Sequence, residues 1–351
     1  MKKIFLLVAC CMTLLFGMDI LSNPFSKSIP AIKTIQGPVL IDRLNENDLK
    51  MILFYSDISS SHIEAYTVDS TQVTPLDTTY TSYTEGFIEN SQNLLLLEAV
   101  NNYRALEGLE PISYYHNYIE INGYGFLSLT KGLSTLYIID LSTYAVTCPT
   151  FDSAYALDEQ YIYQISEGED CYYILSAAAN SYKAYWYALN KNDFSLSDSK
   201  QLSPPSKALY SNQYALDETG TSYFIGNHSL LIMTLDETIN LPLSFNPDSV
   251  YFNEGKIYTF STSELFLSYA IYDPKLGLED TRQVNLPNKF VTLIGCHIKD
   301  DILYTLTYDE THPLYRNYIT LYNLKDHNMM YCLALKLPKN MTLALQDAHY
   351  D

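Results

Sequence analysis

Residues Tyr118–Thr147 read YIEINGYGFLSLTKGLSTLYIIDLSTYAVT. The stretch holds three short runs rich in β-branched and aromatic residues, separated by Asn-Gly, Lys-Gly and Ser-Thr turn signals. Runs of this kind joined by tight turns are typical of an antiparallel meander. Variants of the pattern recur along the chain, so the sequence predicts a repeat protein built from small sheets.

From Leu49 onward the chain repeatedly gives a strand, a polar turn and a second strand that closes near an Asp or Asn. The expected strands are Met51–Tyr55, Ile63–Asp69, Tyr124–Leu129, Leu136–Asp140, Tyr161–Ile165, Tyr172–Leu175, Tyr185–Asn190, Tyr223–Ile225, Leu230–Asp236, Lys256–Phe260, Leu265–Asp273, Ile302–Thr307 and Tyr318–Asn323. One residue at the same place in each repeat can be taken as a reference point: Tyr66, Tyr137, Tyr185, Leu231, Tyr269 and Ile319. Successive reference points are 71, 48, 46, 38 and 50 residues apart. Because the first gap is nearly double the others, a further unit is expected inside it.

That further unit falls on Asn93–Pro111, NLLLLEAVNNYRALEGLEP. It reads either as a hairpin that turns at Asn101-Asn102 or as a helix, since Ala99, Tyr103 and Leu106 share a helical face and Gly108 would end it. The hairpin is favoured here because a repeat must fill the gap.

A period of about 40 to 50 residues with about four strands per unit is typical of β-propeller blades. The segment Leu216–Ile225, LDETGTSYFI, followed by Leu230–Asp236, resembles the blade opening of NHL-type and related secreted propellers, where a turn Asp and Gly precede the first inner strand. The resemblance covers the rhythm of most of residues 37–351. It implies an all-β fold, a single β-propeller of about seven four-stranded antiparallel blades, with six or eight blades as alternatives. A pair of β-sandwiches is the competing architecture.

Two further patterns bear on the repeats. Tyr155–Glu159, YALDE, returns as Tyr214–Glu218, each just before an expected strand pair. Gly37–Asp42 is expected to add an outer strand to the last blade, where Tyr331–Leu337 and Met341–Leu345 also lie, because pairing the termini removes a free edge.

The composition is that of a globular chain, 47% hydrophobic and 17% charged, with 33 tyrosines. The formal net charge of −19 repels phosphate backbones and anionic headgroups. Nucleic-acid binding is therefore not expected, and membrane contact is expected only through the N-terminus. A protein partner or a glycan remains compatible with this surface, and a monomer is expected.

The first 18 residues form an export signal or N-terminal anchor: Lys2 and Lys3 precede the uncharged apolar run Ile4–Met18. Within it, Leu7-Val8-Ala9-Cys10 resembles a bacterial lipoprotein box, which makes Cys10 the lipidation candidate. A cleaved signal and an uncleaved anchor are the alternatives. Residues 19–36 are expected to be a tether and 37–351 the propeller, with the bulk of the chain outside the cytoplasm.

The remaining cysteines, Cys148, Cys171, Cys296 and Cys332, contain no C-x-x-C pair. A zinc site of that type is therefore not indicated, and buried free thiols are favoured over a disulfide that the compartment would permit.

The sequence contains no G-x-S-x-G, H-E-x-x-H, G-x-x-x-x-G-K or D-x-D-x-D-G motif, so it names no catalytic residue, cofactor or metal site. The seven histidines are scattered at positions 62, 116, 228, 297, 312, 327 and 349. Asp217 with Gly220 resembles the Asp box of sialidase-like propellers, which is a structural turn. Two functions follow: a non-catalytic binding or scaffold module, which the lack of motifs favours, and an extracytoplasmic hydrolase, lyase or lactonase-like enzyme with its site at the central channel.

Overall fold

The computed structural model describes residues 39–40, 49–57, 63–69, 73–75, 80–83, 86–115, 117–129, 135–151, 160–178, 183–204, 213–263, 266–286, 291–299, 301–309, 317–326, 329–336 and 341–350. Side chains are described from residue 88 to residue 332, with gaps. The predicted export signal and tether, Cys10 and the Tyr155–Glu159 repeat lie outside these residues.

The chain forms two compact units. The terminal unit comprises residues 1–77, 262–267 and 283–351, and the central unit comprises residues 78–261 and 268–282.

The terminal unit holds two sheets, ordered β1-β26-β25-β24-β23 and β27-β2-β3-β4. Their strands are β1 (Val39–Leu40), β2 (Leu49–Asp57), β3 (Ile63–Asp69), β4 (Val73–Pro75), β23 (Val291–Lys299), β24 (Ile302–Asp309), β25 (Asn317–Asn323), β26 (Met329–Lys336) and β27 (Met341–Tyr350).

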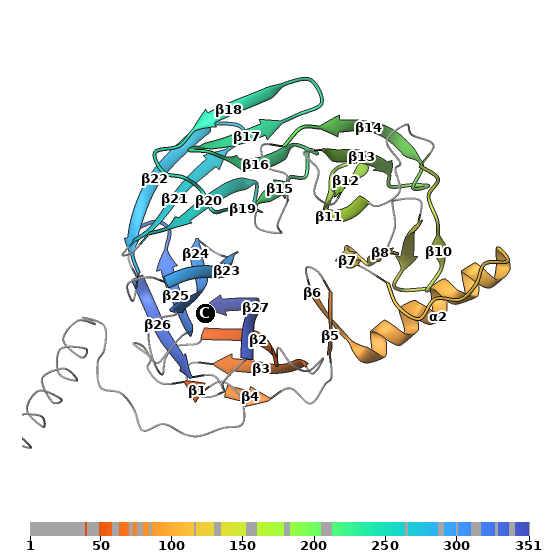
Figure 1. Cartoon of the computed structure of the whole chain (residues 1–351), viewed down its shortest axis with the longest axis horizontal. Coiled ribbons are helices and arrows are strands. Elements are labelled where there is room, and N and C mark those ends of the chain that lie inside the picture. The colour runs from red at the N-terminus through yellow and green to blue at the C-terminus, as the bar shows by residue number, and fades with distance from the viewer. Residues whose placement is uncertain are drawn as a thin grey trace, which may run out of the picture. The chain divides into compact units, whose positions relative to one another are not determined.

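The central unit holds a β5-β6 hairpin, the helix α2 (Asn90–Leu106) and four sheets ordered β10-β9-β8-β7, β11-β12-β13-β14, β15-β16-β17-β18 and β19-β20-β21-β22 (Figure 1). Short stretches of the last sheet, at 262, 266–267 and 283–285, belong to the terminal unit.

The strands of the hairpin and of the first two sheets are β5 (Tyr80–Tyr83), β6 (Gly86–Glu89), β7 (Asn117–Ile121), β8 (Tyr124–Ser128), β9 (Leu136–Asp140), β10 (Val146–Thr147), β11 (Gln160–Glu167), β12 (Cys171–Ala178), β13 (Ala184–Asn190) and β14 (Leu196–Leu202). Those of the other two sheets are β15 (Tyr214–Leu216), β16 (Ser222–Gly226), β17 (Ser229–Met233), β18 (Thr238–Pro242), β19 (Ser249–Asn253), β20 (Lys256–Thr262), β21 (Phe266–Asp273) and β22 (Gly277–Asn285).

Five four-stranded antiparallel sheets and one helix are therefore present in the described residues. The prediction of an all-β chain with the four-stranded antiparallel blades of a β-propeller, about seven in number, is confirmed. The stretch Tyr118–Thr147 forms most of the sheet β7 to β10, and its Asn122-Gly123 turn has the two positive φ angles, 45° and 82°, that a tight hairpin requires.

The predicted hairpin at Asn93–Pro111 is wrong: the segment is the helix α2. Its Leu, Ala, Glu and Arg residues are strong helix formers, and Val100 is its only β-branched side chain. Gly108, with φ +67°, ends the helix as the alternative reading expected. A hairpin does lie just before α2: it consists of the four-residue strands β5 and β6.

The two ends of the chain pair inside the terminal unit. β1 pairs with β26 at Val39↔Lys336 and Leu40↔Leu335, so the expected outer strand at Gly37–Asp42 is confirmed. The expectation that Met341–Leu345 lies in the last blade is wrong, because β27 pairs with β2 in the sheet β27-β2-β3-β4 and not with the sheet of β23 to β26. This ladder runs from Leu49↔Tyr350 to Asp57↔Met341. The longer of the two pairings, between β2 and β27, thus covers an edge of β2 that would otherwise be free.

In the central unit the sheets are apolar on both faces. Ala184–Leu189 of β13 are all buried. Tyr185 and Tyr187 pack in a cluster with Phe126 and Ile138 of the preceding sheet, whereas Trp186 packs in a second cluster with residues of β15 to β17. No helix in the described residues is long and apolar enough to cross a membrane.

Removing residues 341–351 should lower the thermal midpoint strongly and broaden the transition, because it deletes β27, which pairs with every residue of β2. Several backbone hydrogen bonds of about 1 kcal/mol each are lost with it. Of the pairings in the described residues, removing residues 1–46 deletes only the two-residue β1 ladder, so a smaller change in the midpoint is expected. Circular dichroism melts of both truncations test this; equal loss in the two would contradict the importance of the β2-β27 pairing.

Candidate functional site

The helix α2 packs one side onto the sheet of β7 to β10. Leu96 and Val100 are fully buried in a cluster with Tyr118, Tyr137 and Ile139. The ring of Tyr103 meets that of Tyr137 edge-on at 5.9 Å. The buried side of the helix is therefore set by Leu96, Val100 and Tyr103. The face expected from Ala99, Tyr103 and Leu106 is wrong at Leu106, which is exposed.

The segment after the helix is held against it by side-chain to backbone bonds. The Asn101 amide binds the backbone of Ile112 twice: Nδ2 donates to its carbonyl at 2.9 Å, and Oδ1 accepts from its N–H at 2.7 Å. The Arg104 guanidinium donates to the Glu110 carbonyl and to the Tyr137 hydroxyl, both at 2.6 Å. Residues 90–112, which we call the α2 platform, thus form a firmly positioned unit.

The outward side of the α2 platform is unusually apolar. Leu94, Leu95, Leu106 and Leu109 are 67%, 45%, 87% and 48% exposed. At 100° per residue, Leu95 and Leu106 are three turns apart on nearly the same line, and Leu94 lies about 100° around the helix from Leu95. Exposed large apolar side chains that are gathered and held in place mark interaction surfaces, whereas a single one is ordinary.

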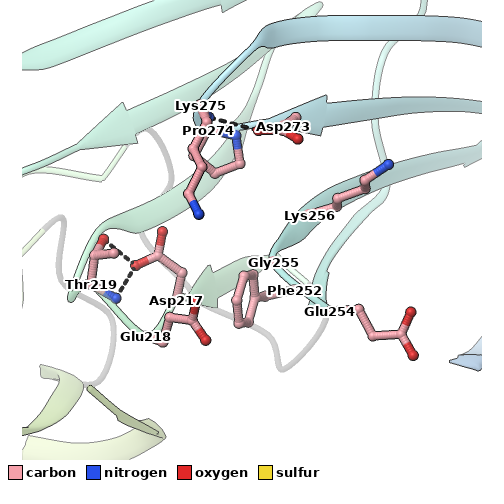
Figure 2. A pocket seen from close by; sticks show the side chains of 10 residues that line it. All are labelled: Asp217, Glu218, Thr219, Phe252, Glu254, Gly255, Lys256, Asp273, Pro274 and Lys275. Carbon is pink, nitrogen blue, oxygen red and sulfur yellow. Dashed lines mark hydrogen bonds between the residues drawn. The ribbon is translucent and has the colours of Figure 1, made fainter. Parts of the chain in front are cut away.

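A second candidate is a pocket of about 170 Å³ in the central unit. It is lined by Asp217, Glu218, Thr219, Phe252, Glu254, Gly255, Lys256, Asp273, Pro274 and Lys275 (Figure 2). Figure 2 shows Lys275 extending toward the Asp217 turn, whereas Glu254 and Lys256 extend away from it. The lining residues include no His, Cys or Ser.

The buried carboxylate of this pocket is occupied by its own turn. Asp217 Oδ1 accepts from the Thr219 N–H at 2.8 Å, the Thr219 hydroxyl at 2.7 Å and the Thr221 N–H at 2.9 Å. Its Oδ2 accepts from the Tyr223 hydroxyl at 2.7 Å. Burial, and then the Asp217 charge, raise the pKa of Tyr223. Four donors compensate the desolvation of Asp217, so the group serves as a turn anchor and is not poised as a base.

The Asp217 turn also joins two sheets. Trp186 Nε1, from β13, donates to the Gly220 carbonyl at 2.7 Å, and the Trp186 ring stacks on Tyr173 at 5.6 Å. Gly220 has φ +82°, and a Cβ there would lie 2.8 Å from Tyr173 and 3.0 Å from Trp186. The structural turn expected for Asp217 and Gly220 is therefore where one sheet docks on the next, and Trp186 is a core residue.

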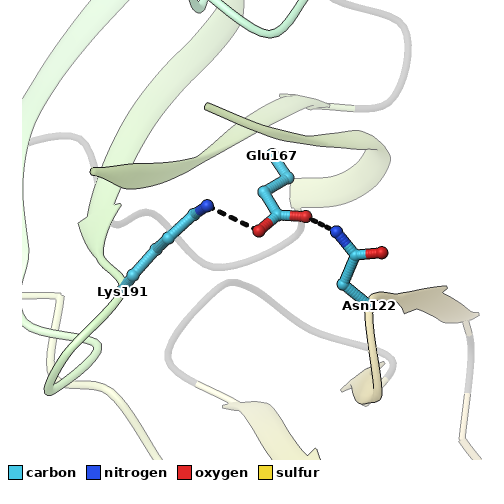
Figure 3. A network of polar contacts seen from close by, with 3 residues as sticks. All are labelled: Asn122, Glu167 and Lys191. Carbon is cyan, nitrogen blue, oxygen red and sulfur yellow. Dashed lines mark hydrogen bonds and ion pairs between the residues drawn. The ribbon is translucent and has the colours of Figure 1, made fainter. Parts of the chain in front are cut away.

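A polar network joins Glu167, the last residue of β11, to Lys191 and Asn122, which lie in turns of the same sheet and of the preceding one (Figure 3). Glu167 accepts from Lys191 Nζ at 2.5 Å and also from the Asn122 amide. Lys191 Nζ lies 5.6 Å from the centre of the Tyr172 ring. Burial, followed by the Glu167 charge, raises the pKa of Tyr172 to about 12. The partly buried Glu167 therefore links the two sheets through its side chain.

The described residues hold no group of three or more His, Cys, Asp and Glu arranged for a metal ion. Of the histidines, His62, His116, His312 and His327 lie outside the described residues, and His228 is an exposed turn residue with φ +50°. Cys148, Cys171, Cys296 and Cys332 are free thiols. Burial raises the pKa of Cys148, so its sulfur stays protonated at neutral pH.

A scan of known protein families finds no matching family, and a search of curated proteins finds no matching sequence. Among solved structures, the chain is similar to a prolyl endopeptidase with 11% identity over 86% of this chain and 49% of the other, at a TM-score of 0.46. It therefore spans about half of that protein's length. A putative 6-phosphogluconolactonase from Bacteroides uniformis gives 8% identity over 84% and 99%, also at 0.46. The Dos1 propeller gives 10% identity over 88% and 76%, at 0.40.

Sequence reasoning missed the α2 platform because the hairpin reading placed strands there. The signal that could have found it was present: the buried spacing of Leu96, Val100 and Tyr103 follows a helical period, and four further leucines in the same segment fall off that face.

Gly220→Ala should destabilise the protein by about 3 kcal/mol, since it combines an unfavourable positive φ with a clash against Tyr173 and Trp186. Gly255→Ala is the matched control: its φ is +76° but nothing lies within 4 Å of the added methyl, so about 1 kcal/mol is expected. Urea unfolding followed by the fluorescence of Trp186, the one tryptophan of the chain, measures both. The docking role fails if the two variants lose the same stability.

Proposed function

We propose that the chain is a non-catalytic binding or scaffold module outside the cytoplasm, held at the cell surface by its N-terminus, and that a protein partner binds the α2 platform. The observation that carries the proposal is the outward side of α2, where Leu94, Leu95 and Leu106 are exposed on a segment fixed by Asn101 and Arg104.

Two quantities favour binding at this surface: the apolar area that a partner buries and the small entropy loss on binding. A partner that buries exposed leucines gains about 25 cal/mol for each Å² of apolar surface removed from water. Because Asn101 and Arg104 already hold the platform, little conformational entropy is lost when the partner arrives.

The alternative, an extracytoplasmic hydrolase, lyase or lactonase-like enzyme, is not favoured by any observation in the described residues. In the pocket beside Asp217 the buried carboxylate is bound by four donors, one of them the Thr219 hydroxyl, and these bonds hold the turn together. The prolyl endopeptidase and the putative 6-phosphogluconolactonase share 11% and 8% identity with this chain and are similar in fold only.

A photo-crosslinking residue at position 106 should give a discrete adduct with one protein of the native envelope. The same residue at position 276 should not, because Leu276 is 79% exposed but stands in a turn away from α2. Leu94→Lys should reduce the adduct at position 106 at least tenfold without changing the melting midpoint, since this side chain is exposed. Equal crosslinking at 106 and 276 would contradict the proposal.

Surface tethering is tested at Cys10. Cys10→Ser should abolish incorporation of a labelled fatty acid and release the protein from the membrane fraction, whereas Cys11→Ser, the adjacent control, should leave both unchanged. Retention of label in Cys10→Ser would remove lipidation at this residue from the proposal.

A further inference from the structure

The exposed charges of the α2 platform have one sign. Residues 86–115 contain four glutamates and one arginine. The arginine, Arg104, is bound to the Tyr137 hydroxyl and the Glu110 carbonyl. Glu98, Glu107 and Glu110 are exposed. Glu98 therefore lies among the exposed leucines, and Glu107 and Glu110 follow them in the chain.

The apolar residues are arranged along the helix and not as a compact spot. Leu95, Asn102 and Leu106 follow one line on α2, and Leu94, Glu98 and Ala105 follow the line next to it. Eleven residues at 1.5 Å per residue place Leu95 and Leu106 about 16.5 Å apart along the axis, about three turns of a second helix lying alongside.

The backbone of α2 decides the form of the partner. An extended peptide binds by adding a strand to a sheet edge, which needs free N–H and C=O groups, whereas the groups inside a helix are bonded to one another. Side chains are all that the middle of α2 offers. An amphipathic helix, which binds through residues three and four apart, is the matching shape.

We propose that the α2 platform binds a cationic amphipathic helix of another protein, whose apolar residues cover Leu94, Leu95 and Leu106 and whose lysines or arginines face Glu98, Glu107 and Glu110. This rests on the proposed function, because it names the partner of the same surface. A second copy of this chain would bring like charges together, and an anionic lipid surface would be repelled by the same carboxylates.

The test uses the full chain and two labelled 18-residue helical peptides, one of Leu and Lys and one of Leu and Gln in the same pattern. Fluorescence anisotropy should give binding of the Leu/Lys peptide at least about tenfold tighter than that of the Leu/Gln peptide, with affinity falling as salt rises. Leu95→Ser with Leu106→Ser should weaken it at least about tenfold. Leu276→Ser, the matched exposed leucine, should not.

Glu98→Gln, Glu107→Gln and Glu110→Gln together should bring the Leu/Lys affinity close to that of the Leu/Gln peptide. Equal affinity for the two peptides would overturn the inference about charge while the crosslink at position 106 still supports the proposed function. Binding of the Leu/Lys peptide that ignores Leu95 and Leu106 would mean general attraction to an acidic protein, and absence of binding would overturn the inference outright.

Discussion

A four-stranded sheet with two apolar faces cannot cover either of them by itself, and in the central unit this constraint governs the packing. In β13 alternate residues belong to different clusters: Tyr185 and Tyr187 face one neighbour, and Trp186 and Ala188 face the other. Only another sheet or a helix against each face removes this surface from water. Polar bonds then fix the contacts, as between Trp186 and the Gly220 carbonyl.

The same need to cover an apolar sheet face explains the position of the helix α2. The face of β9 that carries Tyr137 and Ile139 is covered by Leu96 and Val100 of the helix, together with Ile88 of the short hairpin. A sheet that covers a neighbour can itself be covered on its other face, but a helix on the outside of a sheet buries one side only. The exposure of Leu94 and Leu106 therefore follows from the use of a helix at this place, whereas their apolar character does not, since polar residues would satisfy the fold equally well.

The fold was largely predictable because strand alternation, turn residues and the repeat spacing are local signals. Asn122-Gly123 specifies its hairpin, and the paired strands at Tyr185–Asn190 and Tyr318–Asn323 occur where expected. The pairing of β27 with β2 was misplaced because its partners lie almost 300 residues apart and no local pattern selects between two open edges. The α2 platform was missed because the repeat spacing predicted strands there, whereas the helix propensity of the residues predicted a helix. The role of Glu167 depends on Lys191 and Asn122, which come from other turns and are not linked to it by any spacing.

The contact between α2 and the sheet of β7 to β10 has a further property. Neighbouring strands share a ladder of backbone bonds, so a one-residue shift in one strand moves every side chain to the wrong face. The described contacts between the helix and its sheet are made by side chains, including Leu96, Val100 and the Arg104–Tyr137 hydrogen bond, whereas Asn101 ties the helix to Ile112. Substitutions at the exposed positions 94, 95, 98, 102 and 106 therefore disturb no strand register. Sequence variation at these positions is therefore expected to cost the fold less than variation within a strand.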